Sequence, residues 1–487
     1  MIATETTIET LKFFVNGKWE VSAGHELHSI TNPATGRVIA RVPYATAADI
    51  DRTARSAHEA FLKWREVPVV ERVQVFYRYK DLLERHAEDL ARALTTENGK
   101  TLDDARGEIR RAIQMVEVSC GMPSLMMGQS LENVSRGIDC HTIRQPLGVC
   151  AGITPFNFPG MVPMWMFPFA IACGNSFILK PSEKAPMTPT RTAELLEQAG
   201  VPAGVYNLVQ GDKEAVDALL QHPLVRAISF VGSTPIAKYI YENAAKNGKR
   251  VQALGGAKNH LIVMPDANLE KSVEAIMGSA FGAAGERCLA GSVLVAVGSV
   301  AAPLLDLLLE KCRQMRVGDG AEAHTEMGPL VTAAHRQRVE NYIEKGVAEG
   351  AKPLCDGRNA ASKDGGYFLG PTIFDNVTPE MTIAREEIFG PVLSVMRVKD
   401  LDEAIALVNH SPFGNTSSIF TTDGKSAREY AARIEAGMVG INVGVAAPMA
   451  FFPFSGWKQS FFGDLHAHGR DAVAFYTEQK VIMSRWF

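Results

Sequence analysis

The stretch Gly148-Val-Cys-Ala-Gly-Ile-Thr-Pro155 is a short β-rich run that is followed by a long apolar segment and then by a second β-rich run, Phe177-Ile-Leu-Lys-Pro-Ser182. Pro159, Pro163 and Pro168 interrupt the apolar segment, which argues against a membrane span. A buried helix between two strands explains the segment better. The stretch therefore predicts a strand, a helix and a second strand, in that order.

The same alternation continues along the chain. β-rich runs at 206–211, 227–233 and 250–256 alternate with helical stretches, and a second series begins at His260. Within that series, a predicted helix from Leu269 to Ala284 leads towards a cysteine. Strands that alternate with helices at this spacing form βαβ units on a parallel sheet. We therefore assign the chain to the α/β fold class.

The change from one series to the other places a domain boundary near Gly255-Gly256. We expect a first domain from residues 1–120 and 145–254, and a second domain from residues 255–464. The remaining segments, 121–144 and 465–487, continue neither series, and the end of the second is β-rich. Such segments can pair as an exposed flap that needs a partner subunit to cover it.

The composition limits the classes of function. The chain has 487 residues, of which 46% are hydrophobic, and a formal net charge of -4, which disfavours nucleic acid or an anionic membrane surface as a partner. The amino terminus has no basic region followed by an apolar stretch, so no secretory signal is visible and the cytoplasm is expected. The seven cysteines include no CxxC pair and no Cys/His cluster, which argues against a disulfide framework and a metal site.

Cys288 lies in Phe281-Gly-Ala-Ala-Gly-Glu-Arg-Cys-Leu-Ala-Gly291, where most side chains are small. A thiol is a useful nucleophile when it is accessible and when nearby positive charge favours its thiolate. Arg287 supplies positive charge, and the small residues leave room for a substrate. A small core residue at a helix end is the alternative, and these residues alone do not decide. If the space serves catalysis, leucine in place of Ala284 or Ala290 should reduce turnover much more than folding.

Several motifs follow one another along the chain. They are ITPFNFP at 153–159, LKPSE at 179–183, FVGST at 230–234, GERC at 285–288 and EEIFGPV at 386–392. Their order and spacing resemble the aldehyde dehydrogenase superfamily over nearly the whole chain. The resemblance implies a Rossmann-type NAD-binding domain, an α/β catalytic domain and a β oligomerisation flap.

The resemblance also implies a catalytic role for Cys288. In the family, this cysteine attacks the aldehyde carbon, and the resulting thiohemiacetal gives hydride to NAD and becomes a thioester. A developing oxyanion needs fixed hydrogen-bond donors. The side-chain amide of Asn157 and the backbone N–H of Cys288 would provide two. Taken without the motif around it, Asn157 could equally cap a helix or turn.

The common dinucleotide fingerprint GxGxxG is missing after the first strand. A helix start after Gly232 and Ser233 offers free amides and a helix dipole for a pyrophosphate, although a simple cap by Ser233 is the commoner explanation. The resemblance assigns the other cofactor residues: Lys180, Glu183 and Lys184 at the adenosine ribose, Thr154 and Phe156 along the cleft, and Glu387 and Phe389 at the nicotinamide ribose and ring. A carboxylate repels a 2′-phosphate, so Glu183 favours NAD over NADP.

One residue that the family resemblance would lead us to expect is missing. Most hydrolytic members carry a glutamate in Leu-Glu-Leu-Gly-Gly that activates water, and here Val251-Gln-Ala-Leu-Gly-Gly256 places Ala253 at that position. General-base assistance is worth about 10²–10⁴-fold, so water should cleave the thioester slowly. We do not expect Glu286, the nearest carboxylate in sequence, to replace the missing base.

The missing base, together with the segments 156–175 and 251–268, resembles the CoA-acylating methylmalonate-semialdehyde dehydrogenase subfamily. This resemblance implies that methylmalonate or malonate semialdehyde, NAD and coenzyme A give propionyl-CoA or acetyl-CoA, carbon dioxide and NADH. It also implies cationic partners for the substrate carboxylate, for which Arg287 and Arg111 are candidates. Arg111 could instead be a surface residue, because Arg110 is its neighbour.

Two other functions remain compatible with the sequence. A hydrolytic dehydrogenase of a small anionic aldehyde such as succinate semialdehyde should have a glutamate at position 253. A catalytically silent structural homologue would not need Cys288, Asn157 and Glu387 together. One methyl group in a pocket is worth only about 1–3 kcal/mol, so the sequence does not separate the two semialdehydes. The flap predicts a homodimer or a homotetramer.

Overall fold

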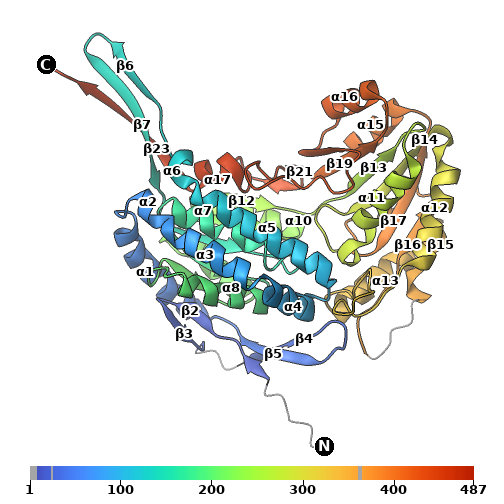
Figure 1. The fold of residues 1–487 in the computed structure, drawn as a ribbon, viewed down its shortest axis with the longest axis horizontal. Coiled ribbons are helices and arrows are strands. Elements are labelled where there is room, and N and C mark those ends of the chain that lie inside the picture. The colour runs from blue at the N-terminus through green and yellow to red at the C-terminus, as the bar shows by residue number, and fades with distance from the viewer. Residues whose placement is uncertain (1–7, 23–25, 360–364) are drawn as a thin grey trace, which may run out of the picture.

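The structure is a computed structural model that describes residues 8–22, 26–359 and 365–487. Residues 1–7, which contribute to the expectation that no secretory signal is present, lie outside the described part. Figure 1 shows two large sheets side by side, each with helices around it, and a narrow sheet that projects from the body. No helix in the described ranges is long and apolar enough to cross a membrane.

The first large sheet has eight strands. In spatial order they are β22 (Phe461–Phe462), β12 (Arg250–Leu254), β11 (Val225–Val231), β8 (Val149–Ile153), β9 (Ser176–Lys180), β10 (Tyr206–Leu208), β2 (Phe13–Val15) and β3 (Lys18–Glu20). The pairs from β12 to β10 are parallel, as the alternation predicts, and antiparallel pairs occur at the two edges. The strand order reverses between β8 and β11, and ligands bind at the carboxyl ends of strands beside such a reversal.

The second large sheet has seven strands. In spatial order they are β15 (Lys352–Cys355), β16 (Thr372–Asp375), β17 (Val392–Val398), β14 (Gly291–Val297), β13 (Asn259–Val263), β19 (Thr416–Phe420) and β20 (Met438–Ile441). Its pairs are parallel except for β15 with β16 at one edge. The chain passes from the first sheet to the second between Leu254 and Asn259.

The apolar segment between β8 and β9 forms the predicted buried helix, although it is short. A 3₁₀ turn at Val162–Trp165 precedes α7 (Phe167–Ala172), and every residue of α7 is buried. Pro163 and Pro168 lie in the first turns of these two helices. A proline at that position removes no helical hydrogen bond, because the first N–H groups of a helix have no partner within it.

Two longer helices meet at a corner beside the loop that follows β8. They are α4 (Ala87–Asn98) and α5 (Leu102–Cys120). Gly99 ends α4 with a left-handed φ of 89°, and Thr101 caps α5 by accepting the backbone N–H of Asp104. Lys100 lies between these two caps and is buried.

The helix that was expected from Leu269 to Ala284 is shorter than predicted, because α11 spans Leu269–Phe281. Ala283 and Ala284 follow it with φ angles of 49° and 51°, and Gly285 has a φ of 72°. This left-handed region costs about 1–2 kcal/mol for each residue other than glycine and cannot continue a right-handed helix. The chain therefore makes a strained turn before it reaches Cys288.

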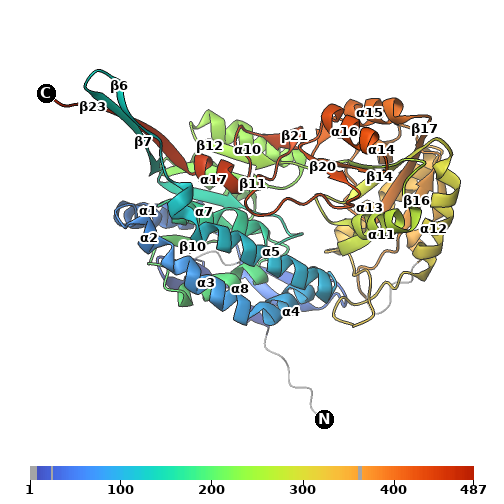
Figure 2. The same cartoon turned by 45° about the horizontal axis from the view of Figure 1, so that its top comes forward.

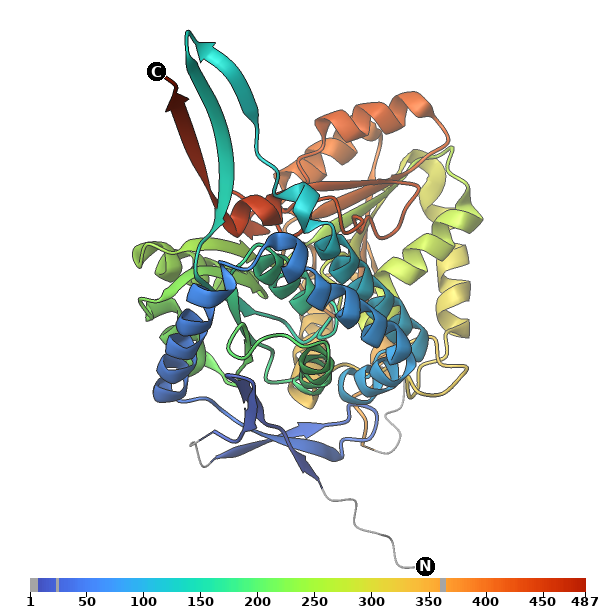
Figure 3. The same cartoon turned by 60° about the vertical axis from the view of Figure 1, so that its left-hand side comes forward.

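The projecting sheet has the strand order β23 (Thr477–Arg485), β7 (Ile138–Pro146) and β6 (Ser130–Ser135). β23 and β7 pair antiparallel over nine residues. Figure 2 and Figure 3 show this sheet extending away from the body in two further views. The segments expected to form the flap also contain α6 (Met122–Leu125) and α17 (Gly469–Phe475), and α17 packs into the same core as α7. The part that projects is therefore shorter than those two segments.

Candidate active site

Loops that follow strands of the first sheet meet loops that precede strands of the second. Asn157 follows β8, and its Nδ2 donates a hydrogen bond to the backbone carbonyl of Glu286 at 3.0 Å. Glu387 precedes β17, and its Oε1 accepts the backbone N–H of Ala257 at 2.9 Å. The fold thus brings the motifs around Asn157, Cys288 and Glu387 together between the two sheets.

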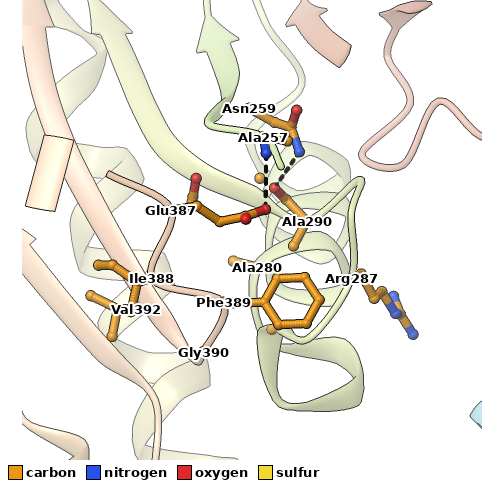
Figure 4. Close-up of a pocket in the computed structure, with 13 residues that line it drawn as sticks. Ala257, Asn259, Ala280, Arg287, Ala290, Glu387, Ile388, Phe389, Gly390 and Val392 are labelled. Atoms are coloured by element: carbon orange, nitrogen blue, oxygen red, sulfur yellow. Dashed lines mark hydrogen bonds between the residues drawn. The ribbon is translucent and has the colours of Figure 1, made fainter. Parts of the chain in front are cut away.

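Cys288 is partly exposed in the segment between α11 and β14. Its backbone carbonyl accepts hydrogen bonds from Nδ2 of Asn259 and Nδ2 of Asn415, both at 2.9 Å. Asn259 Nδ2 also donates to the carbonyl of Ala290 at 2.9 Å (Figure 4). The two asparagines therefore fix the peptide that carries the thiol, while the thiol itself stays accessible.

The thiol of Cys288 is protonated at neutral pH. Burial raises its pKa to about 12, and the negative charge of Glu387 contributes to the increase. The backbone N–H groups of Cys288 and Leu289 and the charge of Arg287 lower the pKa. Arg287 thus favours the thiolate, as predicted, but burial and Glu387 outweigh it in the protein without ligands.

Asn157 is placed to donate to an oxyanion. The residue is buried, and a side-chain amide has two N–H groups, one of which is used by the Glu286 carbonyl. That bond fixes the plane of the amide beside the backbone that leads to Cys288. The second N–H can then donate to an oxygen on the carbon that the thiol attacks.

Glu387 lines a small cavity that also includes Ala257, Arg287 and Ala290 (Figure 4). Burial raises the pKa of its carboxyl group to about 7, whereas the Ala257 N–H and the charge of Lys258 lower it. Because Ala257 bonds to Oε1, the carboxyl group is fixed at one oxygen. The other oxygen can accept hydrogen bonds from ribose hydroxyls.

Phe156 and Phe389 form one wall of the site, in agreement with their predicted places along the cleft. Their rings pack edge to face, with centroids 5.8 Å apart. The ring of His335 lies against both, and its Nε2 is 2.7 Å from the Phe389 carbonyl oxygen. Phe389 has a φ of 61°, and such strain in a bulky residue is concentrated at functional sites.

The structure separates the three residues that the resemblance places at the adenosine ribose. Lys180 is buried, its Nζ donates to the Gly211 carbonyl at 2.7 Å, and burial lowers its pKa. Glu183 is partly exposed and lies 3.6 Å from Lys180 Nζ, so its carboxylate remains open to ribose hydroxyls. Lys184 instead places its Nζ 4.8 Å from the ring centroid of Phe156, and therefore lines the cleft.

Gly232 and Ser233 lie between β11 and α10 (Thr234–Lys246). Ser233 occupies the N-cap position, but its side chain makes no capping hydrogen bond, which differs from the cap considered in the sequence. The first amides of α10 are thus available to an anion at the positive end of the helix dipole. Thr154 has a buried hydroxyl that lacks a hydrogen-bond partner within the described part of the chain. Both features fit a bound dinucleotide, because buried polar atoms are normally paired.

Arg287 is already paired. Its guanidinium forms an ion pair with Asp104 of α5 and donates to the Gly278 carbonyl at 3.0 Å. It also lies against Gly282, where an added Cβ would be 2.6 Å from Nη1. Figure 4 shows the guanidinium pointing away from Glu387. These contacts weaken the expectation that Arg287 binds a substrate carboxylate.

Arg111 is the more available of the two predicted arginines. It is partly exposed, whereas its neighbour Arg110 is exposed. The guanidinium of Arg111 contacts the Met449 sulfur at 3.1 Å and the Ala447 carbonyl at 3.3 Å, and neither contact neutralises its charge. A carboxylate can therefore still pair with it.

The small residues around the nucleophile are only partly explained by space for ligands. Gly285 has a positive φ, and an added Cβ would lie 2.3 Å from the carbonyl oxygen of Gly390. Gly291 packs as closely against a leucine of β13, and Ala284 is buried in the core of the second sheet. Leucine at position 284 should therefore damage folding, which corrects the expectation from the sequence. Ala290 lines the cavity and remains the suitable position for a steric test.

The position of the missing base offers no proton acceptor. Ala253 is fully buried in β12. The carboxyl group of Glu286 accepts the Val331 N–H at 3.3 Å and lies 3.4 Å from His335 Nε2, so structural contacts already occupy it. Among the described residues, no group of three or more His, Cys, Asp or Glu could hold a metal ion.

Sequence reasoning did not find Asn259, Asn415 and Lys258. Lys258 is buried, its Nζ has no hydrogen-bond partner in the ranges that the structure covers, and burial lowers its pKa to about 7. Asn415 is 127 residues away from Cys288 in the chain, and only the fold brings its amide to the cysteine carbonyl. No local pattern distinguishes such residues from ordinary loop asparagines and lysines.

Comparisons with known proteins agree with this geometry. A model of the aldehyde dehydrogenase family matches residues 19–482. Malonate-semialdehyde dehydrogenase 2 of Geobacillus kaustophilus is 53% identical over 482 residues, which cover 99% of this chain and 100% of that protein. The structure of methylmalonate-semialdehyde dehydrogenase from Oceanimonas doudoroffii has a TM-score of 0.97 at 47% identity, and covers 98% of this chain and 99% of its own.

A second solved structure, of a Sinorhizobium meliloti 1021 protein complexed with NAD, also has a TM-score of 0.97 at 47% identity. The similarity covers 99% of this chain and 99% of the other. The resemblance drawn from the motifs is therefore confirmed, and the chain belongs to the aldehyde dehydrogenase family.

Proposed function

We propose that this protein oxidises malonate semialdehyde, methylmalonate semialdehyde or both with NAD, and transfers the acyl group to coenzyme A after loss of carbon dioxide. The names of its relatives from Geobacillus kaustophilus and Oceanimonas doudoroffii support this choice of substrate. The observation that carries the transfer to coenzyme A is the buried methyl group of Ala253 at the position of the water-activating glutamate.

The first step is attack of the Cys288 sulfur on the aldehyde carbon. The aldehyde oxygen becomes an alkoxide, to which the second N–H of Asn157 and the backbone N–H of Cys288 donate. The thiol must lose its proton in this step. Glu387 acts electrostatically on the thiol and has a pKa of about 7, so its carboxyl group can hold a proton at neutral pH.

The residues of the cleft would hold NAD, which when bound supplies the oxidant that converts the thiohemiacetal on Cys288 into a thioester. The first amides of α10 face the pyrophosphate, and Glu183 accepts from the adenosine ribose. Glu387 accepts from the second ribose, and the wall of Phe156 and Phe389 excludes water from the thioester.

The substrate carboxylate is held by Arg111, whose charge has no carboxylate in the contacts made by its guanidinium. In a malonyl thioester, this carboxylate is β to the carbonyl group, which receives the electron pair when the carbon–carbon bond breaks. Carbon dioxide leaves, and a proton takes its place on the carbon. The coenzyme A thiol then attacks the remaining acetyl or propionyl thioester and regenerates the Cys288 thiol.

The proposal is tested by NADH formation from malonate semialdehyde, its methyl homologue and succinate semialdehyde, each with and without coenzyme A. Turnover of the first two aldehydes should require coenzyme A and should be lost in Cys288→Ala. Preference for succinate semialdehyde with sustained turnover in the absence of coenzyme A would identify a hydrolytic dehydrogenase. No turnover of any aldehyde would support the silent homologue. A cytoplasmic location and a homodimeric or homotetrameric state stay predictions from the sequence.

A further inference from the structure

A buried ion pair lies under the loop that carries Asn157, and the proposed reaction does not use it. The side chains of Lys100 and Glu108 are 1% and 0% exposed, and Lys100 Nζ is 2.6 Å from Glu108 Oε2. A buried ion pair contributes little net stability, because the loss of hydration offsets the attraction between the charges. The other contacts of the two side chains indicate a different role.

Both members of the pair bind the backbone of loop 156–161. Lys100 Nζ donates to the carbonyl of Asn157 at 2.6 Å. Glu108 Oε1 accepts the backbone N–H of Gly160 at 2.8 Å and that of Met161 at 3.1 Å. One of these bonds is therefore made to the peptide of Asn157 itself, and the other two hold the far end of its loop.

Neighbouring contacts restrict the loop further. Asn98, the last residue of α4, donates from Nδ2 to the carbonyl of Phe156 at 3.0 Å. The ammonium group of Lys100 lies 4.2 Å from the ring centroid of Phe158. Consecutive residues of the loop are thus held by the corner between α4 and α5.

We propose that Lys100 and Glu108 are positioning residues that hold Asn157 in the geometry needed to stabilise the oxyanion. This inference rests on the proposed function, in which the Asn157 amide donates to the alkoxide. One N–H of that amide is fixed on the Glu286 carbonyl, so a shift of the Asn157 backbone changes where the other N–H points. A misplacement of about 1 Å in a catalytic group can reduce a rate by about 10²-fold.

The first variant to test is Lys100→Met, which removes the bond to the Asn157 carbonyl. We expect kcat to fall about tenfold or more, with KM for NAD changed by less than about threefold. Lys249→Met is the matched control, because Lys249 is also buried and its Nζ donates to the carbonyls of His222 and Val225. That control should lose stability and keep its kcat.

Lys100→Met leaves the Glu108 carboxylate buried without its cation, so the variant could fail to fold. The double variant Lys100→Met with Glu108→Gln avoids the unpaired charge and keeps an oxygen for the Gly160 N–H. It should show the same loss of kcat, and circular dichroism and thermal unfolding establish that each variant is folded before its rate is compared.

The decisive comparison repeats these variants in an Asn157→Ala background. Asn157→Ala alone should lower kcat by about 10²–10³-fold, as expected for loss of an oxyanion donor. Removal of Lys100 should then reduce kcat by no more than about twofold, since the group that it positions is gone. An equal loss in both backgrounds would overturn the positioning role and leave the oxyanion assignment intact. An unchanged kcat in Asn157→Ala would overturn both.

Discussion

Two charges act on the thiol of Cys288 in opposite directions. Burial is the largest cause of its raised pKa, Glu387 raises the pKa further, and Arg287 lowers it. Arg287 is also paired with Asp104, which leaves less of its charge unscreened. The free enzyme therefore keeps its nucleophile protonated, and a protonated thiol resists oxidation and alkylation.

Replacement of Glu387 by glutamine should speed alkylation of Cys288 by iodoacetamide in the absence of ligands. Removal of a negative charge lowers the pKa of the thiol and increases the thiolate fraction, by about threefold to tenfold for a change of up to one pKa unit. Since the pKa of Glu387 is about 7, the charge is present above neutral pH and absent well below it. The difference between variant and wild type should thus grow as pH rises through 7.

The measurement is the alkylation rate as a function of pH, with Arg287→Met as a variant of opposite sign. Loss of that positive charge should raise the thiol pKa and slow alkylation. Slower alkylation of Glu387→Gln above neutral pH would show that Glu387 does not raise the pKa of Cys288.

Glu286 should make the stability of the protein depend on pH. Burial raises the pKa of its carboxyl group from 4.5 to about 8, so the folded state binds this proton more tightly than the unfolded state. Its contribution to stability is complete below about pH 4.5 and is lost as pH rises through about 8. His335 beside it stays neutral, because burial lowers the pKa of the ring to about 4.

Glu286→Gln should therefore flatten the fall in unfolding free energy between weakly acidic and weakly alkaline pH, by an amount on the order of a few kcal/mol. Urea unfolding of both proteins at the two ends of this range measures the effect. The same pH dependence in the variant and the wild type would mean that Glu286 is ionised in the folded protein.

At the scale of elements, the turn after α11 links the nucleophile to the loop that carries Glu387. Gly285 lies in this turn with a φ of 72°, and a Cβ on it would meet the Gly390 carbonyl oxygen at 2.3 Å. The two loops therefore approach each other more closely than any side chain would permit. Their contact sets the position of Cys288 relative to Glu387.

Gly285→Ala should destabilise the protein by about 2–4 kcal/mol and reduce turnover, because it combines a left-handed backbone with a steric clash. Gly278→Ala is the control, since Gly278 lies within α11 and an added Cβ there would have no atom within 4 Å. That change should be neutral or stabilising by about 0.5–1 kcal/mol. Thermal unfolding and NADH formation measure both, and equal stability of the two variants would contradict the packing described.

The elements that the sequence predicted best are the central strands of the two sheets. Parallel strands are buried on both faces and read as continuous apolar runs, as in β8 and β9, where every residue is buried. The end of α11 was not predictable, because alanine favours a helix at positions 283 and 284. The close contact between Gly285 and Gly390, which is a property of the tertiary fold, is what requires a turn there.

The residues that perform the chemistry were easier to predict than those that support them. Cys288, Asn157 and Glu387 lie in local motifs, and the fold brings these motifs together. Their supports, such as Lys100 and Asn415, come from distant parts of the chain and make bonds to backbone atoms. Such bonds leave no pattern in the sequence, because any side chain with a suitable donor can make them.

At the scale of the whole molecule, the projecting sheet leaves apolar side chains uncovered. Val481 and Met483 lie on the same face of β23, which is an edge strand, and are 59% and 67% exposed. A long apolar edge strand is a surface for pairing with another chain. The structure of one chain therefore agrees with the expectation of a partner subunit.

The double variant Val481→Asp with Met483→Asp should reduce the molecular mass in solution from that of a homodimer or homotetramer towards a smaller species. Two carboxylates on this face would oppose burial of the strand against a second copy. Light scattering coupled to size-exclusion chromatography measures the mass, with the exposed substitution Lys480→Asp on the other face of β23 as control. An unchanged mass in the apolar-face variant would place the subunit interface elsewhere.

The central claim is that no group of the protein activates water against the thioester on Cys288. The most direct test is a rapid-mixing measurement of NADH with malonate semialdehyde and NAD but without coenzyme A, combined with the mass of the intact protein. We predict a burst of about one NADH per Cys288, followed by a slow phase, and an acyl group that stays on Cys288 until coenzyme A is added. Linear NADH formation without a burst, and a protein that carries no acyl group, would show that water cleaves the thioester despite Ala253.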